Sequence, residues 1–164
     1  MGTLTRQCVT LYYMELTTAM LADGAHVAEG KLYILGGQWD RLAAARFPVQ
    51  HPSMAVVLVI KIDYNEAPKT STLNIELMLD GESMGIKSMG SMSIGHAAGL
   101  ARGAPQFAPA AVTFNNVQFE KPGRYEWVIS AGAETLGQIP LEVIQGIETA
   151  VPGPQSAPPA SPTE

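Results

Sequence analysis

The sequence predicts an all-β protein, a single antiparallel β-sandwich of seven to eight strands with at most one short helix. Three observations indicate this fold class. Apolar and polar residues alternate over several stretches, turn-forming residues interrupt these stretches about every ten positions, and helical periodicity is nearly absent. The chain has 164 residues, of which 46% are hydrophobic, so it can form one domain with a buried core.

The early strands are bounded by residues that favour turns. Residues 31–35 predict a strand that starts after the turn at Gly30. Gly36 and Gly37 let the backbone bend or bulge where this strand ends. Residues 56–64 are β-branched and apolar at first and then alternate with charged residues. They predict a central strand that is covered on both faces where it begins.

The middle of the chain contains one helical candidate and the clearest strand. The candidate is the short stretch 41–46, whose end is set by Pro48. Residues 73–79 alternate strictly and place four apolar side chains on one face, which we expect to face the core. Asp80 and Gly81 follow directly and predict a hairpin turn that closes this strand.

The last strands follow the same pattern. A turn containing Gly132 separates the final two strands, and Pro140 predicts that the last one is an edge strand or only partly paired. We expect one strand, or a kinked pair, at residues 111–114 and 117–119. Two further strands are expected at residues 125–129 and 139–144.

Both ends of the chain differ from the strand-rich part, which we expect to span residues 14–148. Residues 1–13 look like an appended piece, with Met14 as the expected natural start, in which case Cys8 has no role. Residues 149–164 are rich in proline and poor in large apolar side chains, so the sequence predicts a disordered tail there.

Composition and charge exclude several classes of function. The net charge is -5 and the basic residues form no cluster, so we expect no nucleic-acid partner. The longest apolar run, residues 54–60, is too short to cross a membrane as a helix, and residues 1–9 do not form a signal peptide. The single cysteine, Cys8, excludes an internal disulfide and suits a reducing compartment. We therefore expect a cytoplasmic protein without membrane partners.

Residues 81–85 spell G-x-S-x-G, the pattern around the nucleophile of many serine hydrolases. In the α/β-hydrolase fold a helix follows the nucleophilic serine, but the residues after Gly85 have no helical periodicity. His96 is the only histidine after Ser83, and no acidic residue lies between them, so the chain order of the triad is also missing. We interpret Ser83 as a turn residue and expect no catalytic residues. A triad of Ser83, an aspartate and either His96 or His26 is a remote alternative.

The sequence offers no clear metal or cofactor site. The histidines have no metal-ligand spacing, and we expect neither a bound metal nor a cofactor. Aspartates at one end of a sandwich can bind Ca²⁺ through their oxygens, but aspartate also favours turns in proteins without ligands. Calcium binding therefore stays open for the four aspartates expected at strand ends, namely Asp23, Asp40, Asp63 and Asp80.

The most informative segment for function is residues 85–109, a predicted loop of unusual length for a compact domain. It is rich in Met, Ser, Gly, Ala and Pro. Methionine makes adaptable apolar contacts, and glycine lets the backbone follow a partner. The loop is either an insertion without a role or an interaction surface. The candidate ligand or partner surface consists of Trp39, Met84, Met89, Met92 and His96.

Two segments resemble a known family. They are LADGAHVAEGKLYILGG at residues 21–37 and EKPGRYEWVI at residues 120–129, and the similarity extends over about residues 14–144. The family consists of small bacterial and phage-associated proteins of unknown function. The resemblance implies a compact β-sandwich, and it transfers no catalytic or ligand residues.

The sequence thus favours a non-enzymatic binding or assembly module over an enzyme. Its partner is expected to be another protein or a second copy, because unpaired sheet edges can accept a further strand. The alternative is a small-ligand or carbohydrate-binding sandwich that stacks its ligand on Trp39, Tyr33 or Trp127. Exposed rings beside a concave face would favour this alternative, and buried rings would favour the module.

Overall fold

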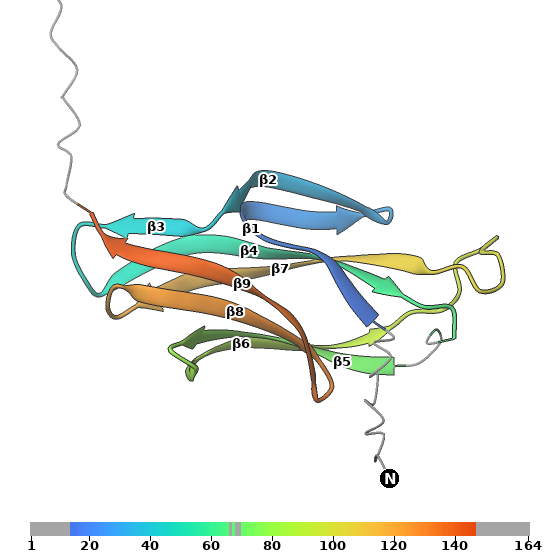
Figure 1. Cartoon of the computed structure of the whole chain (residues 1–164). Helices are drawn as coiled ribbons and strands as arrows, with labels where there is room; N and C mark the ends of the chain where they lie inside the picture. Colours follow the sequence, from blue (N-terminus) through green and yellow to red (C-terminus); the bar gives the residue numbers. More distant parts are fainter. Residues whose placement is uncertain (1–13, 66, 68–69, 147–164) are drawn as a thin grey trace, which may run out of the picture.

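Two β-sheets packed face to face make up the computed structural model of the chain (Figure 1). The structure describes residues 14–65, 67 and 70–146. In this part of the chain there are nine strands and no helix, so the all-β sandwich is confirmed with one strand more than the sequence predicts. The expectations for residues 1–13 and 149–164 lie outside the described residues.

The first sheet has the strand order β2-β1-β4-β7 and the second has the order β3-β9-β8-β5-β6. All neighbouring strands are antiparallel except β3 and β9, which run parallel. The strands are β1 (Met14–Ala28), β2 (Lys31–Trp39), β3 (Arg41–Ala44), β4 (Val49–Ile62), β5 (Thr70–Leu79), β6 (Glu82–Ser93), β7 (Gln106–Phe119), β8 (Gly123–Ala131) and β9 (Glu134–Gln145).

Aromatic side chains from both sheets meet in the main core. Phe114 of β7 packs against Trp127 of β8, with ring centroids 4.3 Å apart. Phe119 of β7 meets Tyr125 of β8 edge to face at 5.0 Å. Trp127 is fully buried and Tyr125 is 1% exposed. These pairs join the two sheets at their inner faces, where aromatic contacts add to the burial of apolar area.

Tyr125 also ties the start of β8 to the turn before it. Its hydroxyl donates a hydrogen bond to the backbone carbonyl of Lys121 over 2.8 Å. Burial raises the pKa of Tyr125 above its ordinary value of 10.0. The neutral hydroxyl is therefore favoured in the folded chain, because charging it there would cost desolvation energy.

A raised tyrosine pKa makes stability depend on alkaline pH. The contribution of Tyr125 should be complete below about pH 10, where the unfolded chain also keeps its tyrosines neutral, and should fall as the pH rises through the higher folded pKa. Urea unfolding at about pH 8 and about pH 11 measures this loss. Tyr125→Phe should be about 1 kcal/mol less stable at the lower pH, from the lost hydrogen bond, and should lose less on going to the higher pH. An equal alkaline loss in both proteins would contradict the expectation.

A third, smaller layer lies over the outer face of the first sheet. The last part of β1 leaves β4 and forms a hairpin with β2, which covers β4 and β7 (Figure 1). Under it, Ala22, Ala55 and Val57 form a second buried cluster. Residues 54–58 are therefore buried on both faces, which confirms that the central strand predicted at residues 56–64 is covered on both faces where that stretch begins.

The helix expected at residues 41–46 is wrong, because residues 41–44 form β3. This strand pairs in parallel with residues 142–145 of β9. An ion pair of 2.7 Å joins Arg41 to Glu142 across the two strands, and the backbone N–H of Glu142 donates to the carbonyl of Asp40. Pairing with an existing sheet thus outweighs the local preference of a short alanine-rich stretch.

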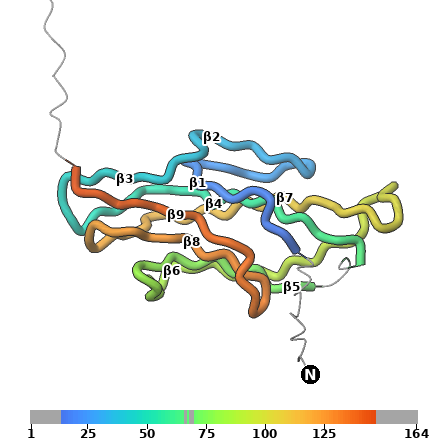
Figure 2. Tube along the Cα trace, viewed as in Figure 1, coloured from blue at the N-terminus to red at the C-terminus, as the bar shows by residue number. Residues whose placement is uncertain are grey.

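The hairpin turn predicted at Asp80 and Gly81 is confirmed. Both residues have positive φ angles, 51° and 82°, which is the geometry of the tight turn that joins β5 to β6. The long loop predicted at residues 85–109 is wrong at both ends. Residues 85–93 belong to β6 and residues 106–109 to β7, so the connection between the strands is residues 94–105 (Figure 2).

Candidate binding site

The two sheets are incompletely filled between the ends of β6 and β7. Residues paired across β5 and β6 share a face, so Gly90, opposite Leu73, faces the interior, as does Ser88, opposite Ile75. On β7 the inward positions nearby are Ala108 and Ala110. Small residues on both strands leave space where bulkier ones fill the core further along.

The resulting space, called the chamber below, is largely open to solvent, reaches around the edge of β7 to the β1–β2 hairpin at Val27 and Gly30, and has a volume of about 820 Å³. A Cβ atom built on Gly90 would have no heavy atom within 4 Å, which shows that this position borders open space. The side chains and backbone that line the chamber belong to Val27, Gly30, Leu73, Gly90, Ser91, Met92, Ser93, Ile94, Gly95, Ala97, Gln106, Phe107, Ala108, Pro109 and Ala110.

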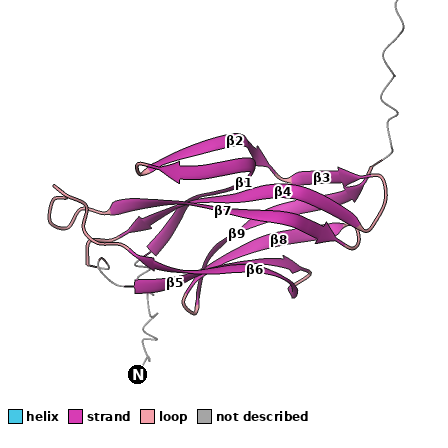
Figure 3. Ribbon diagram, turned by 180° about the vertical axis from the view of Figure 1, so that it is seen from behind, coloured by secondary structure: helices cyan, strands magenta, loops and turns pink. Residues whose placement is uncertain are grey.

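The lining is mostly apolar, with Ser91, Ser93 and Gln106 as its polar residues, and includes no charged residue among those the structure describes. Phe107 is 60% exposed, a large fraction for an aromatic side chain in a strand. Seen from behind, β7 lies above β6, and each is the last strand of its sheet (Figure 3). An uncharged apolar group can therefore reach the chamber between two strand edges, while a charged group would lose hydration there without gaining a partner.

Gln106 holds the loop 94–105 against the first residue of β7. Its side-chain amide donates to the carbonyl of Gly95 over 2.9 Å, and its side-chain oxygen accepts from the N–H of Ala97 over 3.1 Å. Gln106 is only 8% exposed, so both bonds are largely protected from water. The loop is further fixed by His96, whose ring stacks on Tyr64 at 4.1 Å.

Removing the Gln106 side chain should loosen this loop. We expect Gln106→Ala to lower the free energy of unfolding by about 1–3 kcal/mol, because two hydrogen bonds are lost and the Gly95 and Ala97 backbone groups lose their partner. Urea unfolding measures the loss, and amide hydrogen exchange at Ala97 should become faster. Gln118→Ala is the control, since Gln118 is an exposed glutamine of the same strand. If Gln106→Ala and Gln118→Ala had equal effects, the two hydrogen bonds of Gln106 would not be what holds the loop 94–105.

The five residues predicted as a ligand or partner surface do not form one surface. Met92 lines the chamber, and His96 lies in the loop beside it. Met84 packs against the main core, while Met89 is 67% exposed and shares the outer face of the second sheet with its partner Asn74. Trp39 is half-buried in β2 and also packs against the main core.

Sequence reasoning missed most of the chamber. Gly90, Ala108 and Ala110 are small, and Gln106 is an ordinary polar residue at the end of an expected loop. The signal available in the sequence was the small residues at alternate positions of β6 and β7, which leave space for the chamber. They become meaningful only once β6 and β7 are known to lie on the same side of the two sheets.

The aromatic residues considered for ligand stacking differ in exposure. Trp127 is fully buried in the core and cannot contact a ligand. Trp39 is partly buried, and its ring lies 5.7 Å from that of His51. Tyr33 is 47% exposed and stacks on His26 at 4.9 Å. None of the three lines the chamber, so a carbohydrate surface built from them has little support in the geometry.

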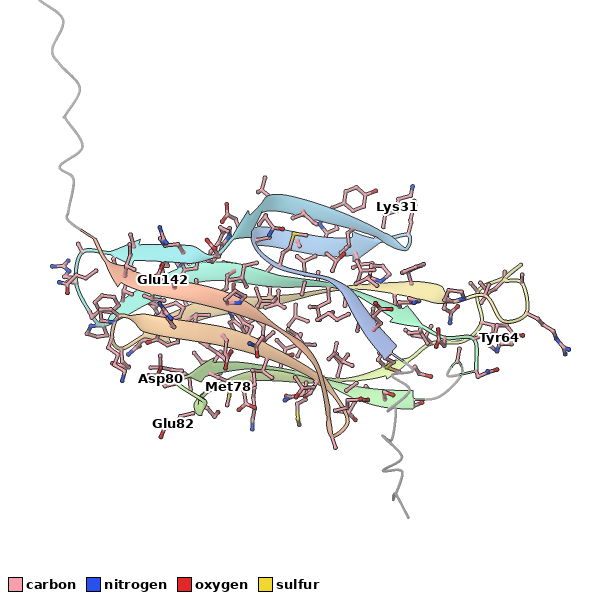
Figure 4. The ribbon with its side chains drawn as sticks, viewed as in Figure 1. Lys31, Tyr64, Met78, Asp80, Glu82 and Glu142 are labelled. Atoms are coloured by element: carbon pink, nitrogen blue, oxygen red, sulfur yellow. The ribbon has the colours of Figure 1, made fainter. Side chains whose placement is uncertain are left out.

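Ser83 has a structural role in the hairpin. Its hydroxyl donates to Glu76 of β5 and accepts from the backbone N–H of Gly85. Figure 4 places Glu82, its neighbour in sequence, at one end of the molecule and Tyr64 at the other. Because His96 stacks on Tyr64, Ser83 and His96 lie at opposite ends and cannot form a dyad.

The four aspartates considered for calcium do not gather. Asp23 lies inside β1 and not at a strand end, which corrects its expected position. In the described part of the chain, no three histidine, cysteine, aspartate or glutamate side chains lie close enough together to hold a metal ion. Nor does any helix in residues 14–65, 67 and 70–146 have the length and apolar character needed to cross a membrane.

Comparison with known proteins gives one match. The family model DUF6941, described only as a family of unknown function, matches residues 17–144. No curated protein matches the chain. No solved structure matches it either.

Proposed function

The chain belongs to DUF6941, a family of unknown function, and we propose that it is a non-enzymatic binding module. In this proposal the chamber takes up an uncharged, apolar part of a protein partner. The partner enters along the β7 side, where Phe107 is exposed. The module acts in the cytoplasm, an assignment supported by a sequence with one cysteine in 164 residues.

The observation that carries the proposal is the chamber itself. It has about 820 Å³ of space, an apolar lining without charge, and strand edges on both sides. Strand edges offer unpaired N–H and C=O groups to an extended peptide, and a neighbouring apolar space accepts every second side chain of such a peptide. The geometry therefore favours a segment with apolar residues at alternate positions.

Selection from a displayed library of random decapeptides tests the proposal. We expect the immobilised protein to enrich uncharged peptides with apolar residues at alternate positions. Gly90→Leu places a bulky side chain in the chamber and should weaken binding of a selected peptide at least about tenfold, or about 1.4 kcal/mol. The backbone of Gly90 is not in the positive-φ region and the space around it is open, so the fold should tolerate leucine.

Gly24→Leu is the matched control. Gly24 is also a strand glycine with open space around it, but it does not line the chamber. Its replacement should leave peptide binding unchanged. Enrichment of charged peptides, or equal binding by the wild type and Gly90→Leu, would argue against the chamber as the binding site.

A second candidate is a small apolar ligand, because the volume of the chamber falls in the range of small-molecule pockets. Nile red, an uncharged dye that fluoresces in apolar surroundings, distinguishes the two. Saturable binding of the dye that Gly90→Leu abolishes, without any enriched peptide, would favour the small ligand.

A further inference from the structure

We propose that β6 is a self-pairing edge, through which two copies of this chain join their five-stranded sheets across a two-fold axis at Ser91. The pairing is antiparallel and uses residues 88–94. It rests on the proposed function as a binding module and names one partner, a second copy. It leaves the β7 side of each chamber to other partners.

Among the described strands, four have a neighbour on one side only: β2, β3, β6 and β7. Three of these edges carry features that hinder the addition of a strand. β3 has four residues. β2 is irregular where Gln38 has a φ of 68°. On β7, Pro109 has no N–H to donate towards the free edge, so an added strand could pair regularly only beyond it, along residues 110–115.

The edge of β6 is different over residues 88–93. Its irregular part ends before this segment, at the bulge where Gly85 has a φ of 73°. From Ser88 to Ser93 the strand has no charge, no proline and no positive φ. A regular, uncharged edge is the kind that pairs with another strand unless something covers it.

The inner face of this segment is complementary to itself. With Ser91 on the two-fold axis, Gly90 of one copy lies opposite Met92 of the other, and Ser88 lies opposite Ile94. A large side chain thus meets a small one at every inward position, and Met92 and Ile94 already line the chamber beside Gly90. An antiparallel pair about a two-fold axis repeats each such contact twice.

The charges also permit this register. With the axis at Ser91, the residue numbers of any two residues that face each other across it add up to 182. Lys87 therefore lies opposite Gly95 of the second copy and not opposite a second Lys87. Ser91, which is exposed, lies opposite Ser91 of the second copy. Like charges directly opposite each other destabilise paired strands, and none occur in this register.

A charge exchange at Ser91 tests the proposal. Wild-type protein should show a concentration-dependent dimer, at about twice the chain mass of 17.4 kDa, in sedimentation equilibrium. Ser91→Glu alone and Ser91→Lys alone should each raise the dimer Kd at least about tenfold, because like charges then meet on the axis. A mixture of the two variants should form dimers again, now with one chain of each kind.

The matched control is Thr113→Glu, which places the same charge at an exposed position of β7. It should leave the dimer unchanged. A wild-type protein that stays monomeric overturns the inference, as does a dimer that Thr113→Glu dissociates and Ser91→Glu does not. Failure to recover dimers from the mixture would also overturn the register.

The same samples separate this inference from the proposed function. A monomer that binds the selected peptide, with loss in Gly90→Leu, refutes the self-pairing edge and leaves the chamber as a binding site. If mixing Ser91→Glu with Ser91→Lys recovers the dimer but no peptide binds, the self-pairing edge is supported and the uptake of other partners is refuted.

Discussion

Trp127→Ala should destabilise the protein by about 3–5 kcal/mol, the largest effect expected of a single truncation here. Trp127 is completely buried, and its ring packs on Phe114 of the opposite sheet at 4.3 Å. Its removal leaves a large space between the two sheets, because rigid strands on both sides cannot close it. Urea unfolding followed by circular dichroism measures the change in the free energy of unfolding.

Trp39→Ala is the control for this prediction. Trp39 is the only other tryptophan, and it is partly buried at the rim of the same core. Its truncation removes less buried apolar area, so the loss should be clearly smaller. If Trp39→Ala cost as much as Trp127→Ala, the contact between β7 and β8 would not be the main attachment of the two sheets.

Gly36→Ala should destabilise the β1–β2 hairpin by about 2–3 kcal/mol, the second largest effect. Gly36 has a φ of 59°, a conformation that alanine adopts at a cost. A Cβ atom at this position would also overlap the carboxylate of Asp23 on the neighbouring strand. Two separate penalties therefore act on one methyl group. Hydrogen exchange of β2 amides, together with urea unfolding, measures the effect.

Two further variants separate the strain from the overlap. Gly30→Ala also places alanine at a positive φ, 72°, but in open space, so it should cost only the conformational part, about 1 kcal/mol. The double change Asp23→Ala with Gly36→Ala removes the overlapping carboxylate and should recover part of the loss. Additive effects of the two single changes would show that the overlap contributes nothing.

The features that sequence predicts best in this chain are local. Alternation over residues 73–79 and the turn at Asp80 and Gly81 predict β5 and its hairpin, because period and turn geometry depend on adjacent residues only. The apolar and β-branched beginning of residues 56–64 predicts a strand that is covered on both faces there. What covers its outer face, the β1–β2 hairpin, depends on β1 leaving β4 after Ala22, where the register of its pairing with β2 shifts.

The features that sequence misses depend on distant pairing. Residues 41–44 become a strand because β9, about a hundred positions later, offers an edge in parallel register. Residues 85–93 are rich in glycine and serine, which are weak strand formers, and they are held as β6 because residues 87–93 pair at seven positions with β5. The chamber needs both strands in place, so no local pattern could have predicted it.

The unequal edges of the two sheets have a consequence for how the molecule can grow. A sandwich with two regular edges can add copies at both sides and extend without limit, as fibres do. Of the two edges that border the chamber, that of β7 is interrupted by Pro109, so beside the chamber β6 is the regular edge of each copy. Pairing of β6 with β6 about a two-fold axis, as proposed above, would occupy this edge in both copies, so assembly through it would stop at two chains.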